Sequence, residues 1–348
     1  MKIIKFKKKS LCSLYITNDY KKFIKISNKL KIIITDYNVY INFYNLIKEI
    51  KNYKFIIFPC GENFKNINTL KIIWKFLIKF FNKNISLLSI GGGVINDIVG
   101  FICSVYLRGI NFIEIPTTLL CQIDSSIGGK NAINFFSKNT IGTIKNPIFI
   151  YLNYSIIFYM NKNDLKDGFA EIIKYFLLNN LKFLFYLYKI FNFKKILIRS
   201  CYIKIKIISQ DYSEKSIRSV LNLGHTYAHC IENNKINKIS HGKSVLIGII
   251  FSLFVSTLYY KIDLFKIFKI LNLFLIFKFK IINKIKFSDE MIKKIILDKK
   301  FNKKINFILF KKISCCTKKI IKKKNLLLLI IFFYEIKINN KMANKSSK

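Results

Sequence analysis

The chain has 348 residues, 52% of them hydrophobic, which suffices for two domains with buried cores and excludes a disordered polymer. Its 61 Lys and Arg against 18 Asp and Glu give a formal net charge of +43, which would ordinarily suggest a nucleic-acid or anionic-membrane partner. The lysines are scattered, however, and Ile, Asn, Phe and Tyr are abundant beside them, as A+T-rich codons produce. We therefore attribute the charge to codon bias, predict no nucleic-acid or membrane partner, and expect an anionic small-molecule substrate.

The eight cysteines form no CxxC pair, so their spacing indicates neither a zinc ribbon nor a redox dithiol. No long apolar segment follows the basic N-terminus, and we expect free thiols in a cytoplasmic protein. The longest uncharged apolar run, residues 245–260, is shorter than a membrane span and predicts a buried helix.

Short apolar runs that stop at turn residues alternate with helical patterns in the first part of the chain. We expect strands at residues 31–35, 54–58, 84–90 and 111–115. This alternation predicts a parallel α/β sheet with ligands at the carboxyl ends of its strands. The predicted organisation is an α/β, Rossmann-like dinucleotide-binding domain over residues 1–155. A mainly α-helical metal- and substrate-binding domain follows over 156–338, with a disordered tail over 339–348.

A glycine triplet, Gly91-Gly92-Gly93, follows the third predicted strand and leads into a helical pattern. Glycines at a strand-to-helix turn let backbone N–H groups approach a pyrophosphate closely, and a helix N-terminus favours its negative charge. The spacing is not GxGxxG, so a tight turn needed only for packing is an equally good interpretation.

Small and polar residues are concentrated between Pro116 and Lys130, in a chain otherwise rich in Ile, Lys and Phe. The segment contains two adjacent hydroxyls, a carboxylate and a Gly-Gly-Lys turn, and Lys138-Asn139 follows soon after. A lysine behind two glycines can approach a phosphate or carboxylate as a point charge. We favour a binding segment over a solvated polar loop.

The three histidines of the chain all fall between residues 225 and 241. His225 and His229 share one face of a predicted helix at i, i+4, and His241 precedes the apolar run. Upstream, Glu171 and Lys174 stand at i, i+3 in an amphipathic stretch. Two imidazoles and one carboxylate make a three-ligand site typical of a catalytic metal, and spacing alone favours His225 and His229 as the imidazoles. The alternative for any one histidine is a satisfied core residue.

Together these blocks resemble the 3-dehydroquinate synthases over roughly residues 30–310. The resemblance rests on ordered motifs: GGGVINDIVGF, YLRG, IPTTLLCQIDSSIGGK, the KN of SKNTIG, GFAEIIKY, RSVLNLGHTYAH and SHGK. It implies that a divalent metal, zinc or cobalt, is bound by Glu171, His225 and His241. His241 therefore takes the place that spacing gave to His229, which the resemblance directs to the substrate.

The resemblance also implies two further sets of residues. NAD would be bound by Asp36, Glu62, Lys65, Gly92, Gly93, Val94, Ile95, Asn96, Asp97, Thr117, Thr118, Lys130 and Lys138. The substrate and catalytic residues would be Asp124, Lys130, Asn139, Lys174, Lys204, Arg218, Asn222, His229 and Lys299 or Lys300, with Arg108 reaching across a homodimer interface.

The sequence departs from the family pattern at Asn96 and Asn131, where Gly and Thr are usual, and at Lys243, where an acidic residue is usual. Cys60 stands where the family commonly has Asp. None of these is an implied metal ligand, but Lys243 lies close to His241 and places the tuning of that ligand in question.

For this family the substrate is 3-deoxy-D-arabino-heptulosonate 7-phosphate, and the product is 3-dehydroquinate on the shikimate route to chorismate and the aromatic amino acids. The implied reaction is a net phosphate elimination and cyclisation in which NAD is regenerated. The alternatives are a sister cyclase that makes inosose or valiolone, a metal-dependent polyol dehydrogenase, and, in another class, a basic RNA-binding protein. Net NADH formation would identify the dehydrogenase, and salt-sensitive RNA retention the RNA-binding protein.

Overall fold

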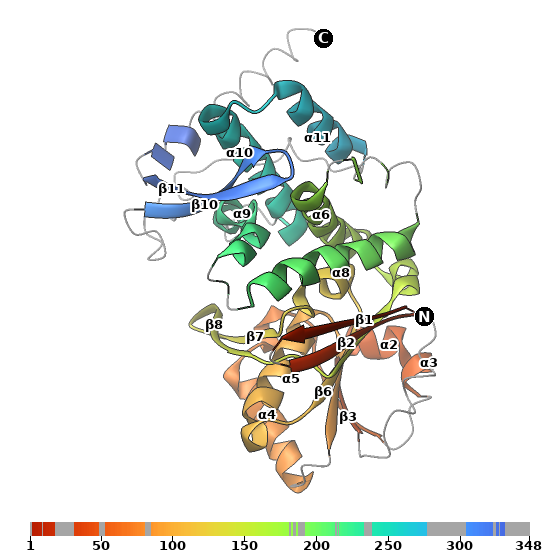
Figure 1. Cartoon of the computed structure of the whole chain (residues 1–348). Coiled ribbons are helices and arrows are strands. Elements are labelled where there is room, and N and C mark those ends of the chain that lie inside the picture. Colours follow the sequence, from red (N-terminus) through yellow and green to blue (C-terminus); the bar gives the residue numbers. More distant parts are fainter. Residues whose placement is uncertain are drawn as a thin grey trace, which may run out of the picture. The chain divides into compact units, whose positions relative to one another are not determined.

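The computed structural model (Figure 1) describes residues 2–8, 10–17, 31–48, 53–80, 85–180, 182–183, 186, 192–212, 214, 216–232, 239–276, 304–322, 325–326 and 328–330. Contacts divide the chain into two compact units. The first comprises Met1–Gly168 and Asn192–Tyr212, and the second comprises Phe169–Phe191 and Ser213–Lys348. The first unit therefore continues past the predicted boundary at residue 155. The predicted tail, residues 339–348, lies outside the described residues.

A seven-stranded sheet forms the centre of the first unit, in the order β1-β2-β9-β6-β5-β3-β4. The four predicted strands are confirmed as β3 Lys31–Asp36, β4 Tyr53–Phe58, β5 Ser86–Gly91 and β6 Phe112–Pro116. They pair in parallel, so their carboxyl ends meet at one edge, as the α/β prediction requires.

Three further strands complete this sheet: β1 Lys2–Lys8, β2 Ser10–Thr17 and β9 Phe149–Asn153. The β1 and β2 strands pair antiparallel, whereas β9 pairs in parallel with both β2 and β6. The fold is therefore a predominantly parallel sheet with one antiparallel edge strand, which is common in α/β proteins.

Apolar residues of the strands alternate between two cores, because successive side chains point to opposite faces of a sheet. Ile32, Leu87 and Phe112 pack on one face with helices α4 Ile67–Leu77 and α5 Gly93–Val105. Ile33 and Leu88 pack on the other face, beside α2 Tyr37–Asn42. Figure 1 shows α4 and α5 on the side of the sheet opposite α2.

The rest of the first unit is made of short connecting elements, a hairpin and a long helix. These are α3 Tyr44–Ile47, η1 Glu62–Phe64, η2 Ile78–Phe80, η3 Tyr106–Arg108, the π-helical η4 Cys121–Ser125, β7 Lys130–Phe135, β8 Ser137–Ile144, η5 Tyr154–Tyr159 and α8 Phe193–Gln210. Helix α6, Lys162–Asn179, contains the division between the units at Gly168.

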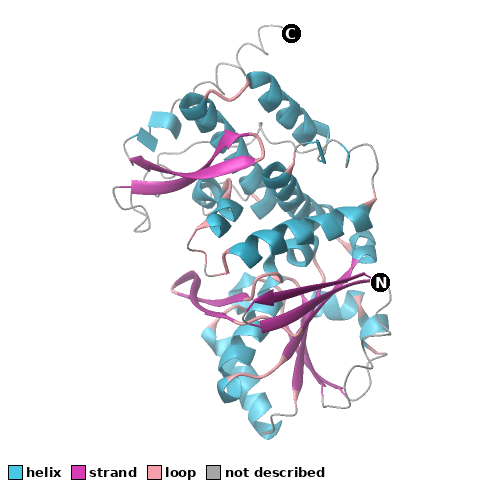
Figure 2. Cartoon of the chain, in the orientation of Figure 1, coloured by secondary structure: helices cyan, strands magenta, loops and turns pink. Residues whose placement is uncertain are grey.

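The second unit is mainly helical, as predicted, and also contains a hairpin that was not predicted (Figure 2). Besides the later part of α6, it consists of η6 Ile217–Asn222, α9 His225–Glu232, α10 His241–Tyr260, α11 Leu264–Ile276, β10 Lys304–Lys312 and β11 Cys315–Lys322. The apolar run at residues 245–260 lies in α10 and is mostly buried. Among the described helices, α10 alone is long and apolar enough to cross a membrane, a test that a buried core helix also passes.

Candidate active site

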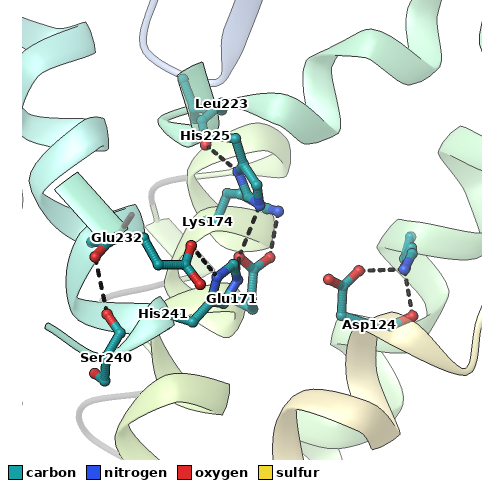
Figure 3. Close-up of polar contacts among 10 residues, drawn as sticks. Asp124, Glu171, Lys174, Leu223, His225, Glu232, Ser240 and His241 are labelled. Atoms are coloured by element: carbon teal, nitrogen blue, oxygen red, sulfur yellow. Dashed lines mark hydrogen bonds and ion pairs between the residues drawn. The ribbon is translucent and has the colours of Figure 1, made fainter. Parts of the chain in front are cut away.

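Three potential metal-binding side chains converge in the second unit: Glu171, His225 and His241. One ligand atom from each lies within 4.8 Å of the others. The Nε2 atoms of His225 and His241 lie 3.7 and 3.9 Å from Glu171 Oε1. Figure 3 shows these side chains pointing toward one another from α6, α9 and α10. A group of two imidazoles and one carboxylate fits a divalent ion with a coordination position left for water or substrate.

Two glycines bring the helices of this group together. Gly224 precedes α9 and has a φ of +79°, a left-handed conformation that favours glycine. A Cβ atom on Gly248 of α10 would lie 1.9 Å from the Gly224 carbonyl oxygen, so only glycine allows this approach. His225 is therefore held beside α10, the helix that begins with His241.

Both histidines of the group have an acceptor at the ring nitrogen that faces away from Glu171. The Nδ1 of His225 lies 3.2 Å from the Leu223 carbonyl oxygen, and the Nδ1 of His241 lies 3.3 Å from Glu232 Oε2. A proton on each Nδ1 leaves the Nε2 lone pairs directed toward Glu171, which is the tautomer that a metal requires. Lys243 has no carboxylate, and the acceptor for His241 Nδ1 is the Glu232 carboxylate instead.

Burial determines the charge state of His225. It is the main cause that lowers the pKa of His225 well below its ordinary value, and the charge of Lys174 acts in the same direction. His225 is therefore neutral near pH 7, as a metal ligand must be. The buried Lys174 ammonium forms an ion pair with the buried Glu171 carboxylate.

The structure places the other predicted residues of this unit as follows. His229 is exposed on α9, outside the group of three, with its ring centroid 5.8 Å from that of His225. Arg218 is buried in η6, and the exposed Asn222 donates to Glu214 Oε1 at 3.1 Å. Lys299 and Lys300 lie outside the described residues.

In the first unit, the Gly91–Gly93 turn joins β5 to α5 at the edge where the parallel strands end. Cβ atoms on Gly92 and Gly93 would lie 3.3 Å from Thr118 Cγ2 and 3.4 Å from Ser125 Oγ. The Thr117 N–H donates to the Gly91 carbonyl oxygen at 3.0 Å, which fixes the turn against the end of β6. Gly93, Val94, Ile95 and Asn96 form the first turn of α5 and Asp97 follows them, so this helix N-terminus fits a pyrophosphate.

Lys65 connects two other predicted residues of this unit. Its buried ammonium forms an ion pair with Asp97 and donates to Asn139 Oδ1 at 2.5 Å. Burial raises the pKa of Asp97 to about 6, and the charge of Lys65 opposes that rise. The exposed Glu62 accepts a hydrogen bond of 2.9 Å from Asn134 Nδ2.

Asp36 lies at the end of β3 and caps α2, because its Oδ1 accepts from the Val39 N–H at 3.0 Å. The Cys60 thiol lies 3.3 Å from the same oxygen. A cysteine at the position where Asp is usual therefore contacts the predicted ribose-binding carboxylate as a weak, uncharged donor.

Asp124 of η4 is paired with Lys204 of α8, which contacts both its carboxylate and its backbone carbonyl. Lys130 and Lys138 are exposed at the starts of β7 and β8. Arg108 is exposed and has a φ of +61°, directly after Leu107 with a φ of +48°. Two consecutive non-glycine residues in the left-handed region are strained, which is frequent at functional sites.

Two acidic residues of these sites, Glu232 and Glu114, were not predicted from the sequence. Glu232 was not predicted as the partner of His241, although Glu232 lies two helical turns after His225 and therefore on the same face of α9. Glu114 was predicted only as part of a strand, yet it is buried beside Asn96 and accepts its amide at 3.3 Å. An acidic residue inside an apolar strand pattern was the available signal.

Comparison with known sequences identifies the family. The 3-dehydroquinate synthase N-terminal domain profile matches residues 55–167, and the C-terminal domain profile matches residues 168–301. The chain is 35% identical over 319 residues to the 3-dehydroquinate synthase of Clostridium tetani, covering 85% of this chain and 82% of that protein. It is 35% identical over 278 residues to that of Buchnera aphidicola subsp. Cinara cedri (76% and 74% covered) and 37% identical over 225 residues to that of Pyrococcus furiosus (63% and 67% covered).

Solved structures share the fold at lower sequence identity. A 2-deoxy-scyllo-inosose synthase complexed with carbaglucose-6-phosphate, NAD+ and Co2+ superposes with a TM-score of 0.84 at 19% identity, covering 94% of this chain and 99% of that one. The 2-epi-5-epi-valiolone synthase of Streptomyces hygroscopicus subsp. jinggangensis, with NAD+ and Zn2+ bound, gives 0.80 at 18% identity, covering 95% and 99%. Both halves of the sequence thus match one family, and the fold agrees: the chain belongs to the 3-dehydroquinate synthase family.

Proposed function

We propose that this protein is a 3-dehydroquinate synthase, which converts 3-deoxy-D-arabino-heptulosonate 7-phosphate to 3-dehydroquinate and phosphate with catalytic NAD and a divalent metal. The observation that carries the proposal is the group of Glu171, His225 and His241, whose ligand atoms lie within 4.8 Å in a chain whose two halves both match this family. Relatives at 35–37% identity bear this name. The solved cyclases of other products, at 18–19% identity, are similar in fold and do not select the substrate.

The donor atoms of the second unit suit a zinc or cobalt ion. Glu171 Oε1 and the Nε2 atoms of His225 and His241 would hold it, with Leu223 and Glu232 keeping the two imidazoles in the required tautomer. When bound, the metal supplies a Lewis acid that polarises a substrate oxygen. Lys174 is paired with Glu171, so its ammonium would balance the charge of this carboxylate until a metal binds there.

The Gly91–Asp97 turn of the first unit suits the pyrophosphate of NAD, with Asp36 at the adenosine ribose and Glu62, Lys65, Thr117, Thr118, Lys130 and Lys138 as further contacts. When bound, NAD supplies a reversible hydride acceptor, so it is needed only in catalytic amount. The proposed residues for the substrate are Asp124, Lys130, Asn139 and Lys204 of the first unit, and Lys174, Arg218, Asn222 and His229 of the second. Lys299 or Lys300 is proposed for the phosphate and Arg108 for a contact across a homodimer interface.

Cations have a defined task in this reaction. The substrate carries a phosphate and a carboxylate, and the Lys and Arg side chains among the proposed residues would hold both in one ring orientation. A carboxylate-binding role for Lys204 and Arg218 favours this substrate over the sugar phosphates of inosose and valiolone synthases, which lack that group. Arg218 is buried, and water screens the attraction between a buried cation and an anion less than it does at the surface.

The test is phosphate release from the heptulosonate phosphate by purified protein with zinc or cobalt and substoichiometric NAD. We expect many phosphates released per NAD, with no accumulation of NADH absorbance, and loss of activity after chelation that added metal reverses. Stoichiometric NADH would identify a polyol dehydrogenase, and turnover only of another sugar phosphate would identify a sister cyclase. We also propose that the enzyme is cytoplasmic and has no nucleic-acid partner. The scattered lysines then have no role in turnover, and replacing the basic run Lys7-Lys8-Lys9 by Gln should change phosphate release by less than about 3-fold.

A further inference from the structure

A small cluster of buried polar side chains lies behind the Gly91–Asp97 turn of the first unit. Asn96 Nδ2 donates to Glu114 Oε2 at 3.3 Å, to Cys121 Sγ at 3.1 Å and to Ser126 Oγ at 3.2 Å. The Sγ and Oγ atoms of Cys121 and Ser126 are 3.1 Å apart. All four side chains are buried, with at most 3% of any of them exposed.

We propose that Glu114 is a positioning residue for the cofactor: through Asn96 and Ser126 it fixes the dinucleotide-binding turn against the end of β6 and against η4. This inference rests on the proposed function in one respect, that NAD binds at this turn. It goes beyond that function in assigning a role to a buried carboxyl that does not itself face the cofactor.

The four side chains come from three different segments of the chain. Asn96 belongs to the first turn of α5, directly before Asp97, and Glu114 lies in β6 shortly before Thr117. Cys121 and Ser126 flank Asp124. The cluster therefore joins the three chain segments from which the proposed NAD and substrate contacts of this region come.

The turn itself has little with which to hold its neighbours in place. Gly92 and Gly93 have no side chains with which to hold their distance from Thr118 and Ser125, and a Cβ atom on either would come within 3.4 Å of those residues. Besides the Thr117–Gly91 main-chain hydrogen bond, the separation of these segments can be held from behind the turn. A buried, hydrogen-bonded network provides such a constraint, because its members lose their bonds when any one segment moves.

The charge state of Glu114 also suits a positioning role. Burial, with a smaller effect from Asp97, raises the pKa of Glu114 to about 8 against the effect of the Ser126 hydrogen bond, so the carboxyl is uncharged at neutral pH. An uncharged acid keeps acceptor oxygens for Asn96 and for the Ser126 hydroxyl. It also adds no negative charge behind a turn that receives a pyrophosphate.

The experiment compares Glu114→Gln, Glu114→Leu and Ser126→Ala in the zinc-loaded full chain, with NAD affinity measured by titration calorimetry and KM for NAD and kcat measured by phosphate release. Gln can both accept and donate, so we expect its NAD affinity within about 3-fold of the wild type. Leu removes both bonds, and we expect at least a roughly 10-fold rise in Kd and KM for NAD, with kcat at saturating NAD changed by less than about 3-fold. Ser126→Ala removes one partner and should give an intermediate rise.

The matched control is Ile115→Val, a mild core truncation in the same strand whose side chain points to the opposite face. It should leave KM for NAD unchanged. Should Glu114→Leu not fold, Ser126→Ala decides alone, and a wild-type KM for NAD in that variant refutes the positioning role. Wild-type KM in a folded Glu114→Leu, or an equal loss of NAD binding in Glu114→Gln, also overturns it. A wild-type chain that fails to bind NAD overturns the proposed function together with this inference.

Discussion

Replacing Glu114 by Gln should stabilise the protein at neutral pH and have little effect in mild acid. The carboxyl has an ordinary pKa of 4.5 and a folded-state pKa of about 8, so the folded chain binds more protons than the unfolded chain between these values. The free energy of unfolding therefore falls as pH rises through that window, by about 1.4 kcal/mol for each pH unit. Near pH 7 the accumulated cost is about 3 kcal/mol, and Gln, which has the same shape and no charge to suppress, does not incur it.

Urea unfolding of the two proteins at about pH 5 and pH 7.5 measures this difference. The matched control is Glu62→Gln, the same chemical change at an exposed position of the same unit, which should shift the unfolding free energy by less than about 0.5 kcal/mol at either pH. If the Glu114→Gln variant and the wild type keep the same difference in stability at both pH values, Glu114 does not take up a proton on folding and the reasoning fails.

Three further predictions concern the metal-binding group. Glu232→Ala should weaken zinc affinity about 10–100-fold in a chelator competition, because His241 loses its Nδ1 acceptor, whereas Glu232→Gln should lose less; equal affinities in all three proteins would contradict this. By elemental analysis, His241→Ala should lose the metal and His229→Ala should retain it while losing turnover; metal loss from His229→Ala would exchange the two roles. Gly248→Ala should lower the free energy of unfolding by at least about 1–3 kcal/mol and weaken zinc binding, because its Cβ would overlap the Gly224 carbonyl; unchanged zinc affinity would show that this contact does not set the ligand positions.

Much of the first unit could be predicted because Gly, Pro and Asp mark where its strands end. The strands at β3, β4, β5 and β6 each stop at such a residue. β1, with the sequence KIIKFKK, and the β10–β11 hairpin have no such markers. In a chain dominated by Ile, Lys and Phe, the hydrophobic pattern alone does not separate strand from helix.

The metal group shows where local spacing stops being informative. The i, i+4 rule singled out His225 and His229, because it compares residues on a single helix. The structure instead groups His225 with His241, which belongs to the next helix. That grouping depends on the approach of Gly248 to Gly224, a tertiary contact that no short pattern contains. Only the resemblance to a family, carried by several motifs together, pointed to His241.

The contact between Gly224 and Gly248 also bears on how this chain tolerates mutation. At this point the two segments meet through their main chains, so their separation there does not depend on the size of a side chain. A change in the size of neighbouring apolar side chains therefore leaves the closeness of this main-chain contact beside His225 unaltered. The requirement for glycine at this contact thus falls on two positions whose side chains take no part in binding, yet which set how closely His225 approaches the helix of His241.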